Sequence, residues 1–175
     1  MEIRKANIKT DFEAVWGIFK AVISTGDTYA FSPDTPKSSL PTYWFAESMD
    51  TFVAVEKNEI VGTYFIKPNQ PGLGDHIANC GYMVAPDHRG QGIGKLLCEH
   101  SIRFAKEQGY SGIQFNFVVS TNASAINLWL KLGFEIIGTT PNGFRHVDRG
   151  FVDTYILYKA RSEERRVGKE CRSRW

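Results

Sequence analysis

The chain has 175 residues, of which 42% are hydrophobic and 23% charged, a composition typical of a globular domain and unlike that of a disordered or fibrous chain. The formal net charge of +2 is smaller than that of a typical nucleic-acid-binding domain, and no apolar run approaches the roughly 18 residues of a membrane-spanning helix. We therefore expect no nucleic-acid or membrane partner. The three cysteines form no CxxC pair, which favours a reduced, cytoplasmic protein.

The first elements can be predicted from residues 1–50. Residues 1–6 alternate weakly in polarity and predict a strand. Thr10 and Glu13 have the spacing of a capping box, and the apolar residues that follow predict a helix over 11–24. Turn-forming residues then predict a loop over 25–41, and loops this long are often functional. A short second helix is expected over residues 41–48.

The rest of the chain alternates between predicted strands and helices. Further strands are predicted over 51–56, 60–66, 76–85, 112–120, 134–139 and 151–159. Further helices are predicted over 90–108, and from Thr121 or Asn122 to Leu132. Lys57 and Asn58 form the turn of a hairpin, and Gly109 and Gly133 stand where helix C-caps are expected. This order predicts one α/β (α+β) domain over residues 1–161.

Residues 162–175 differ from this domain in charge. They carry five basic and three acidic residues, so 16 of each sign remain from the totals of 21 and 19. Either this basic tail is a nucleic-acid-binding arm or it is a non-native or disordered extension. We favour the second interpretation, because the predicted fold is complete before it.

The stretch HRGQGIGKLL, from His88 to Leu97, places three glycines where a helix begins. The first N–H groups of a helix have no internal partner and carry the positive end of its dipole, and glycine lets an anion approach them. The spacing does not fit a Walker loop, and it does not fit a dinucleotide fingerprint. It does fit Arg-x-x-Gly-x-Gly, at Arg89, Gly92 and Gly94.

In its context, VAPDHRGQGIGKLL closely resembles motif A of the Gcn5-related N-acetyltransferase (GNAT) superfamily. A second stretch, NASAINLWLKLGF, resembles another signature of these enzymes and lies at the expected distance. The resemblance implies a central mixed, mostly antiparallel sheet of about six to seven strands with about four helices. It also implies acetyl-CoA as co-substrate, direct transfer of the acetyl group to an amine, and a homodimer.

The resemblance assigns residues to acetyl-CoA. The backbone of the motif loop, residues 89–95, would bind the pyrophosphate. The strand before this loop would pair with the pantetheine arm. The candidate cofactor-binding residues are Met83, Val84, Arg89, Gly90, Gln91, Gly92, Ile93, Gly94, Lys95, Asn122 and Asn127. Asn122 is equally a candidate helix N-cap.

The catalytic residues are harder to assign. Many members of the family use a glutamate on the central strand, but residues 76–85 contain no carboxylate. Asp75, His76, His146 and Asp148 remain as alternatives, together with a water chain. Where the family has a tyrosine acid, this chain has Trp129, a hydrogen-bond donor that is no useful acid. The catalytic candidates are therefore Asn79, Asn116 and Trp129.

The acceptor is expected to be a small molecule. FNFVVSTN resembles, more loosely, acetyltransferases of proline analogues, which implies an amino acid or an analogue of one. The candidate substrate-binding residues are Tyr29, Phe31, Asn79, Tyr82 and Asn116. A protein acceptor and a non-catalytic CoA sensor are the alternatives. No metal site is expected, because the histidines lack ligand spacing, and Cys80 is expected to pack rather than react.

Overall fold

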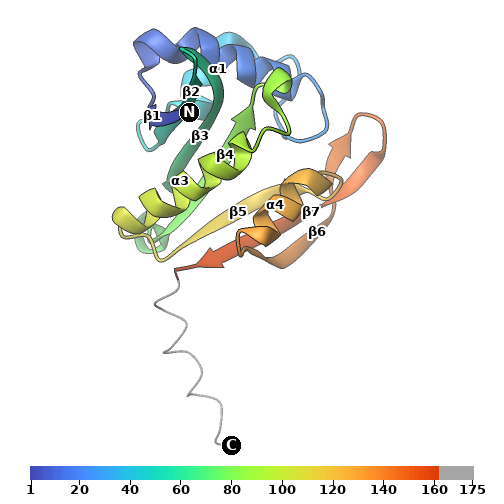
Figure 1. Ribbon diagram of the computed structural model, residues 1–175. Helices are drawn as coiled ribbons and strands as arrows, with labels where there is room; N and C mark the ends of the chain where they lie inside the picture. Colours follow the sequence, from blue (N-terminus) through green and yellow to red (C-terminus); the bar gives the residue numbers. More distant parts are fainter. Residues whose placement is uncertain (162–175) are drawn as a thin grey trace, which may run out of the picture.

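The computed structural model describes residues 1–161, so the prediction for residues 162–175 lies outside the described residues. The strands are β1 (Glu2–Lys5), β2 (Asp50–Glu56), β3 (Glu59–Pro68), β4 (Ile77–Val84), β5 (Gly112–Val119), β6 (Glu135–His146) and β7 (Gly150–Ala160). They form one sheet in the order β1-β2-β3-β4-β5-β7-β6. Every pair is antiparallel except β4 with β5 (Figure 1). This is the mixed, mostly antiparallel sheet that the resemblance to the GNAT superfamily implies.

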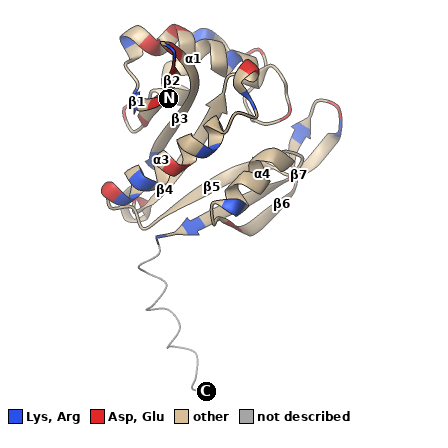
Figure 2. Ribbon diagram, viewed as in Figure 1, with Lys and Arg blue, Asp and Glu red and all other residues tan. Residues whose placement is uncertain are grey.

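Helices cover both faces of the sheet. They are α1 (Ile8–Ile23), α2 (Leu40–Trp44), α3 (Ile93–Glu107) and α4 (Ala123–Lys131). Side chains of α1 and α2 share one apolar core with β2 and β3, and those of α3 and α4 share a second core on the opposite face. Basic and acidic residues are interspersed over α1 and α3 (Figure 2). No helix within residues 1–161 is long and apolar enough to cross a membrane.

The hairpin of β2 and β3 forms as predicted. Lys57 and Asn58 both have positive φ, 48° and 66°, which is the backbone of a two-residue turn that matches the twist of its strands.

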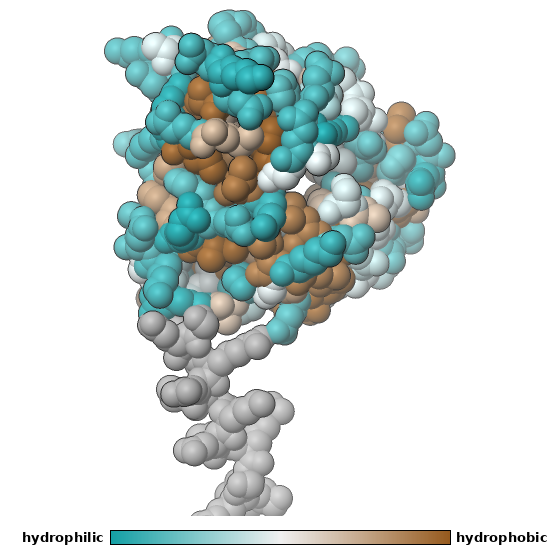
Figure 3. All heavy atoms as spheres, viewed as in Figure 1, coloured by the Kyte–Doolittle hydropathy of each residue, from teal (hydrophilic) through white to brown (hydrophobic). Residues whose placement is uncertain are grey.

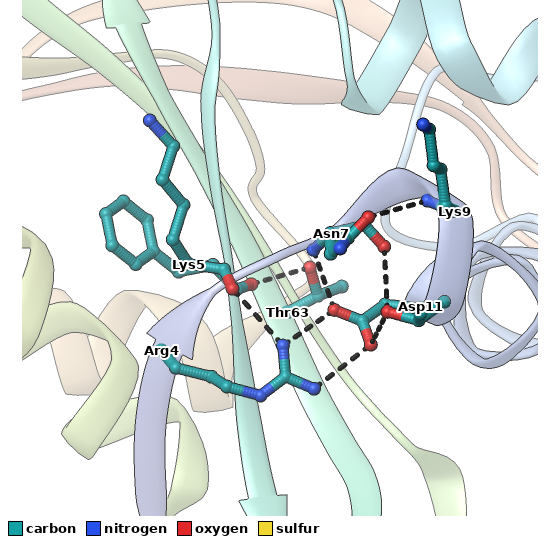
Figure 4. Close-up of polar contacts among 8 residues, drawn as sticks. Arg4, Lys5, Asn7, Lys9, Asp11 and Thr63 are labelled. Carbon is teal, nitrogen blue, oxygen red and sulfur yellow. Dashed lines mark hydrogen bonds and ion pairs between the residues drawn. The ribbon is translucent and has the colours of Figure 1, made fainter.

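The predicted start of α1 is wrong. The helix begins three residues earlier, and its N-cap is Asn7, whose side-chain oxygen accepts the N–H of Lys9 at 2.9 Å (Figure 4). The carboxylate of Asp11 then accepts the N–H of Asn7 at 2.8 Å and two hydrogen bonds from Arg4 at 2.7 and 3.0 Å. Asparagine caps a helix at least as well as threonine, and this ion pair favours the earlier start.

The last two strands are longer than predicted. β6 continues through Pro141, Asn142 and Gly143, which in the sequence are typical of a turn. The pairing register shifts between Thr140 and Phe144, and Asn142, at φ 53°, donates its N–H to the carboxylate of Asp153 at 2.9 Å. A bulge therefore absorbs the turn-forming residues, and the hairpin tip moves to residues 147–149.

Candidate active site

The parallel pair β4–β5 opens after two residue pairs. Ile77 lies opposite Gly112 and Ala78 opposite Ile113, and beyond them the strands diverge (Figure 1). A narrow gap is visible in the space-filling view between the α3 side of the molecule and the part built from α4 and the β6–β7 hairpin (Figure 3).

Two cavities of about 780 and 260 Å³ lie along this divergence. The larger one is lined by the motif loop, the start of α4 and the tip of the β6–β7 hairpin, and the smaller one by β4, β5 and the loop after α1. Residues that line both cavities are Thr28, Tyr29, Tyr82, Asn122, Ala125 and Trp129. The shared walls make this one site with two compartments.

The glycine loop has the backbone of an anion site. Gly90 and Gly92 have φ of 77° and 82°, and a Cβ at either position would meet nothing within 4 Å. No side chain caps α3, whose first intrahelical bond runs from Leu96 N–H to Gly92 O at 3.1 Å. The N–H groups of Ile93, Gly94 and Lys95 therefore have no partner within the helix. A phosphate group can approach them without steric hindrance.

The side chains around the larger cavity suit an anionic ligand with polar arms. Arg89, Lys95 and Arg149 line it, and Asp27 and Asp148 are its carboxylates. Two further polar atoms of the lining, Thr28 Oγ1 and His88 Nδ1, are buried and make no hydrogen bond within residues 1–161. Orphaned atoms of this kind fit a site that a polar ligand completes.

The backbone of β4 faces the cleft at alternate residues. The bonds from Ala85 N–H to Val61 O, 2.9 Å, and from Asn69 N–H to Ile77 O, 2.7 Å, fix the alternation of this antiparallel pair. Met83 lies opposite Thr63 and turns its N–H and C=O toward β3.

The peptide groups of Cys80, Tyr82 and Val84 face away from β3, toward the divergence. Both candidates for the pantetheine arm line the larger cavity, but the peptide groups of Val84 face the divergence and those of Met83 face β3. Met83 is also a buried core residue. The alternating direction of the peptide groups along β4 is the signal that distinguishes Val84 from Met83.

Of the remaining cofactor candidates, some line a cavity and others do not. Asn122 lines both cavities and is the N-cap of α4, accepting the N–H of Ala125 at 3.2 Å. Gln91 and Asn127 are exposed and line neither cavity. The side-chain amide of Gln91 instead donates to the carbonyl of Asp87 at 3.3 Å.

The structure brings the acceptor candidates together at the smaller cavity. Asn79 and Asn116 line it with Tyr29 and Phe31. Asn79 Nδ2 donates to Gln114 O at 2.8 Å, and the Gln114 side chain donates to Asn116 Oδ1 at 2.9 Å. All lining residues are uncharged, and many are aromatic.

Two aromatic residues form the wall between the compartments. The hydroxyl of Tyr82 shares a hydrogen bond of 2.7 Å with Ser101, which holds its ring on the α3 side of the sheet. Trp129, only 8% exposed, packs against the Tyr82 ring with centroids 5.0 Å apart. Both residues line both cavities, so the two compartments meet at these rings.

Of the four titratable side chains that are candidates for the general base, two line a cavity and two do not. His146 and Asp148 line the larger cavity, where His146 Nδ1 accepts the N–H of Asp148 at 3.1 Å. Asp75 and His76 are exposed and line neither cavity. Cys80 is buried at the wall of the smaller cavity, and burial raises the pKa of its thiol above the ordinary value. Within residues 1–161, no group of three or more His, Cys, Asp or Glu side chains could hold a metal ion.

Sequence reasoning missed Asp27, Thr28 and His88 as lining residues. Two of them lie on the loop after α1, which its length marks as a candidate functional segment, but the sequence does not show which side chains turn inward.

This fold and this opening of the sheet are those of an N-acetyltransferase. A GCN5-related N-acetyltransferase from Kribbella flavida superimposes with a TM-score of 0.87 at 36% identity, over 91% of this chain and 97% of that one. A sequence profile of the acetyltransferase (GNAT) family matches residues 19–134. The chain belongs to the GNAT family of acetyltransferases.

Curated relatives match over shorter stretches. N-acetyltransferase aca1 of Schizosaccharomyces pombe is 40% identical over 101 residues, which are 57% of this chain and 48% of that protein. Streptothricin acetyltransferase of Streptomyces lavendulae is 44% identical over 55 residues, 31% of this chain and 29% of that protein. The chain thus spans about half or less of the length of these relatives.

Proposed function

We propose that the protein transfers the acetyl group of acetyl-CoA to the amine of a small molecule, an amino acid or an analogue of one. The observation that carries this proposal is the pair of unequal cavities that meet at Tyr82 and Trp129. A volume of about 780 Å³ suits a large ligand, and about 260 Å³ suits a small one.

The larger cavity would hold acetyl-CoA. The free N–H groups of the α3 N-terminus and the side chains of Arg89 and Lys95 would bind the phosphates. The cleft-facing peptide groups of Val84 would pair with the amides of the pantetheine arm, as an added strand does. The N–H of Tyr82 then lies further along the same edge and would stabilise the oxyanion that develops on the acetyl carbonyl.

The smaller cavity would hold the acceptor. Its aromatic residues offer apolar walls, and the amide groups of Asn79 and Asn116 can orient a polar substrate without titrating. Holding the amine beside the thioester removes much of the entropic barrier. The streptothricin acetyltransferase to which the chain is similar has, by its name, a small molecule as substrate.

Proton transfer would use groups outside the smaller cavity. Only a neutral amine attacks, and all residues that line this compartment lack an acidic or basic side chain. His146 and the carboxylates of Asp27 and Asp148 line the larger cavity, and they would exchange a proton with the amine through water. Trp129 would steady the departing thiolate as a donor, and a thiol pKa of about 8.5 lets that thiolate leave with help from water.

The test is release of free thiol from acetyl-CoA by the full chain, against a panel of amino acids, cyclic imino acids and polyamines. We expect thiol release with one class of small amines. The mass of the acetylated amine should increase by about 42 Da, because one acetyl group replaces one amine hydrogen. The control is the variant Gly92→Val, which fills the anion site. If acetyl-CoA binds and only peptides are acetylated, the acceptor is a protein. If nothing is acetylated, the chain is a CoA sensor, and the proposal is wrong.

A further inference from the structure

The hydroxyl of Tyr29 donates a hydrogen bond to the backbone carbonyl of Tyr82 at 2.7 Å, across 53 positions of sequence. Tyr29 belongs to the loop after α1, and Tyr82 lies on β4 where the sheet opens. The Tyr29 ring has two aromatic neighbours: it stacks on Phe31 with centroids 5.8 Å apart and lies edge-on to Trp44 at 6.2 Å. The hydroxyl is therefore directed at one carbonyl by a fixed ring.

This carbonyl is one that faces the cleft. The alternation of β4 turns the peptide groups of Cys80, Tyr82 and Val84 toward the divergence, where β5 no longer pairs with them. An unpaired strand edge presents both donors and acceptors to a ligand. At Tyr82 the Tyr29 hydroxyl already uses one of the two lone pairs of the carbonyl, so the N–H is the less encumbered group on this edge.

We propose that Tyr29 is a positioning residue that makes the edge of β4 at Tyr82 favour donation to a ligand over acceptance from it. This inference rests on the proposed function and deepens it. A thioester carbonyl has lone pairs and no proton, so it binds where a donor stands and is repelled by a free carbonyl. With the carbonyl of Tyr82 occupied, the acetyl group of acetyl-CoA has one favourable orientation, with its oxygen on the Tyr82 N–H.

One consequence of burial supports this role. Burial raises the pKa of Tyr29 far above its ordinary value, so the hydroxyl keeps its proton and stays a donor. An uncapped Tyr82 carbonyl would instead accept a hydrogen bond from the acceptor's ammonium or from a pantetheine amide, and either would displace the acetyl group.

The competing explanation is that the hydroxyl only anchors the loop after α1. Loop anchoring would affect CoA and acetyl-CoA equally, because both carry the same nucleotide and pantetheine arm. Orientation of the acetyl carbonyl would affect acetyl-CoA alone. The comparison of these two ligands therefore separates the explanations.

The experiment measures dissociation constants for CoA and acetyl-CoA by calorimetry in the full chain and in Tyr29→Phe, which keeps the ring and its contacts. The matched control is Tyr43→Phe, which removes a hydroxyl from the same aromatic cluster, where the Tyr43 ring lies 4.7 Å from Phe31. We expect Tyr29→Phe to weaken acetyl-CoA binding by about five- to tenfold and CoA binding by less than about twofold. We expect kcat to fall by about tenfold with little change in the acceptor KM.

Equal weakening of both ligands, or weakening of neither, would overturn the inference. If Tyr29→Phe does not fold, 4-fluorophenylalanine at position 29 fills the space of the hydroxyl without donating, and the same two affinities decide. The proposed function fails separately, if the unmodified full chain releases no thiol with any acceptor. The ratio of the two affinities can be measured in either case.

Discussion

Asn79 and Gln114 are joined by a single hydrogen bond, from Asn79 Nδ2 to the Gln114 carbonyl at 2.8 Å, at the point where β4 and β5 cease to pair. In a parallel ladder continued from the Ala78–Ile113 pair, that carbonyl would accept the N–H of Cys80. The side chain of Asn79 takes its place. One asparagine thus ends the ladder and leaves the Cys80 peptide group facing the cleft.

Replacement of this asparagine should narrow the smaller cavity. In Asn79→Ala we expect the Cys80 N–H to reach the Gln114 carbonyl and the acceptor KM to rise by about tenfold, while the KM for acetyl-CoA changes by less than about twofold. Steady-state kinetics with both substrates varied will test this. The control is Asn69→Ala, which removes the outer partner of Asn116, bonded at 2.6 Å, and leaves the Asn79 bond intact. Equal effects of the two variants would contradict the argument.

The motif glycine should be sensitive to a single methyl group. Gly92 has φ 82°, so Gly92→Ala strains the backbone by about 1–2 kcal/mol and places a Cβ beside the free N–H groups. We expect the affinity for CoA to fall by at least about tenfold in calorimetry. The matched control is Gly17→Ala in the exposed middle of α1, where nothing lies within 4 Å. This control should bind CoA normally and unfold slightly later, because alanine stabilises a helix interior by about 0.5–1 kcal/mol.

The ion pair between Arg4 and Asp11 at the start of α1 should make the free energy of unfolding depend on pH. The hydrogen bonds from Arg4 hold the pKa of the Asp11 carboxyl below its ordinary value. A carboxyl whose pKa is lowered by folding contributes stability that is complete above its unfolded pKa, about 3.9, and that is lost as the pH falls through the folded value.

We expect Asp11→Asn to lower the free energy of unfolding by about 2 kcal/mol at pH 7 and by much less below pH about 3. Urea unfolding at a series of pH values will measure this. Asp50→Asn is the control, because the Lys5–Asp50 pair is exposed on both sides and such pairs contribute about 0–1 kcal/mol. A cost of Asp11→Asn that is independent of pH would exclude the ion pair as its cause.

The buried cysteines should take no covalent part in the reaction. Burial raises the pKa of Cys98 to about 12, and that of Cys80 also rises, so neither forms a thiolate near neutral pH. We expect peptide mapping after treatment of the folded protein with iodoacetamide at pH 8 to find both unmodified, and Cys80→Ala to retain kcat within about threefold. Double-reciprocal plots should intersect, as direct transfer requires. Parallel lines would indicate an acetylated enzyme instead.

Local sequence patterns were sufficient to predict most helices and strands. The hairpin at Lys57 and Asn58, the strand before Pro86 and the helix that ends just before Gly109 all lie where turn chemistry and apolar periodicity place them. The mixed sheet itself was predicted from resemblance, since no local pattern shows which strands are neighbours. The expected homodimer and the cytoplasmic location stay predictions.

The failures have a common physical origin in contacts between distant residues. Asn7 caps α1 instead of Thr10, and Arg4 pairs with Asp11 at the same end of the helix. β6 passes through Pro141 and Gly143 because β7 holds it on both sides of the bulge. Thr28 and His88 reach the cleft through tertiary packing that no sequence window contains.

The tip of the β6–β7 hairpin touches the loop after α1. Val147 donates its N–H to the carbonyl of Gly26 at 3.2 Å, and a Cβ on Gly26 would come within 3.2 Å of the Val147 side chain. The sheet that separates at Asn79 is therefore bridged again at the far end of the site, and the backbone encircles the cleft. In the proposed function, a small-molecule acceptor would enter this ring from one mouth while the nucleotide occupied the other. A folded polypeptide would lie across the cleft only after the contact between Val147 and Gly26 had opened.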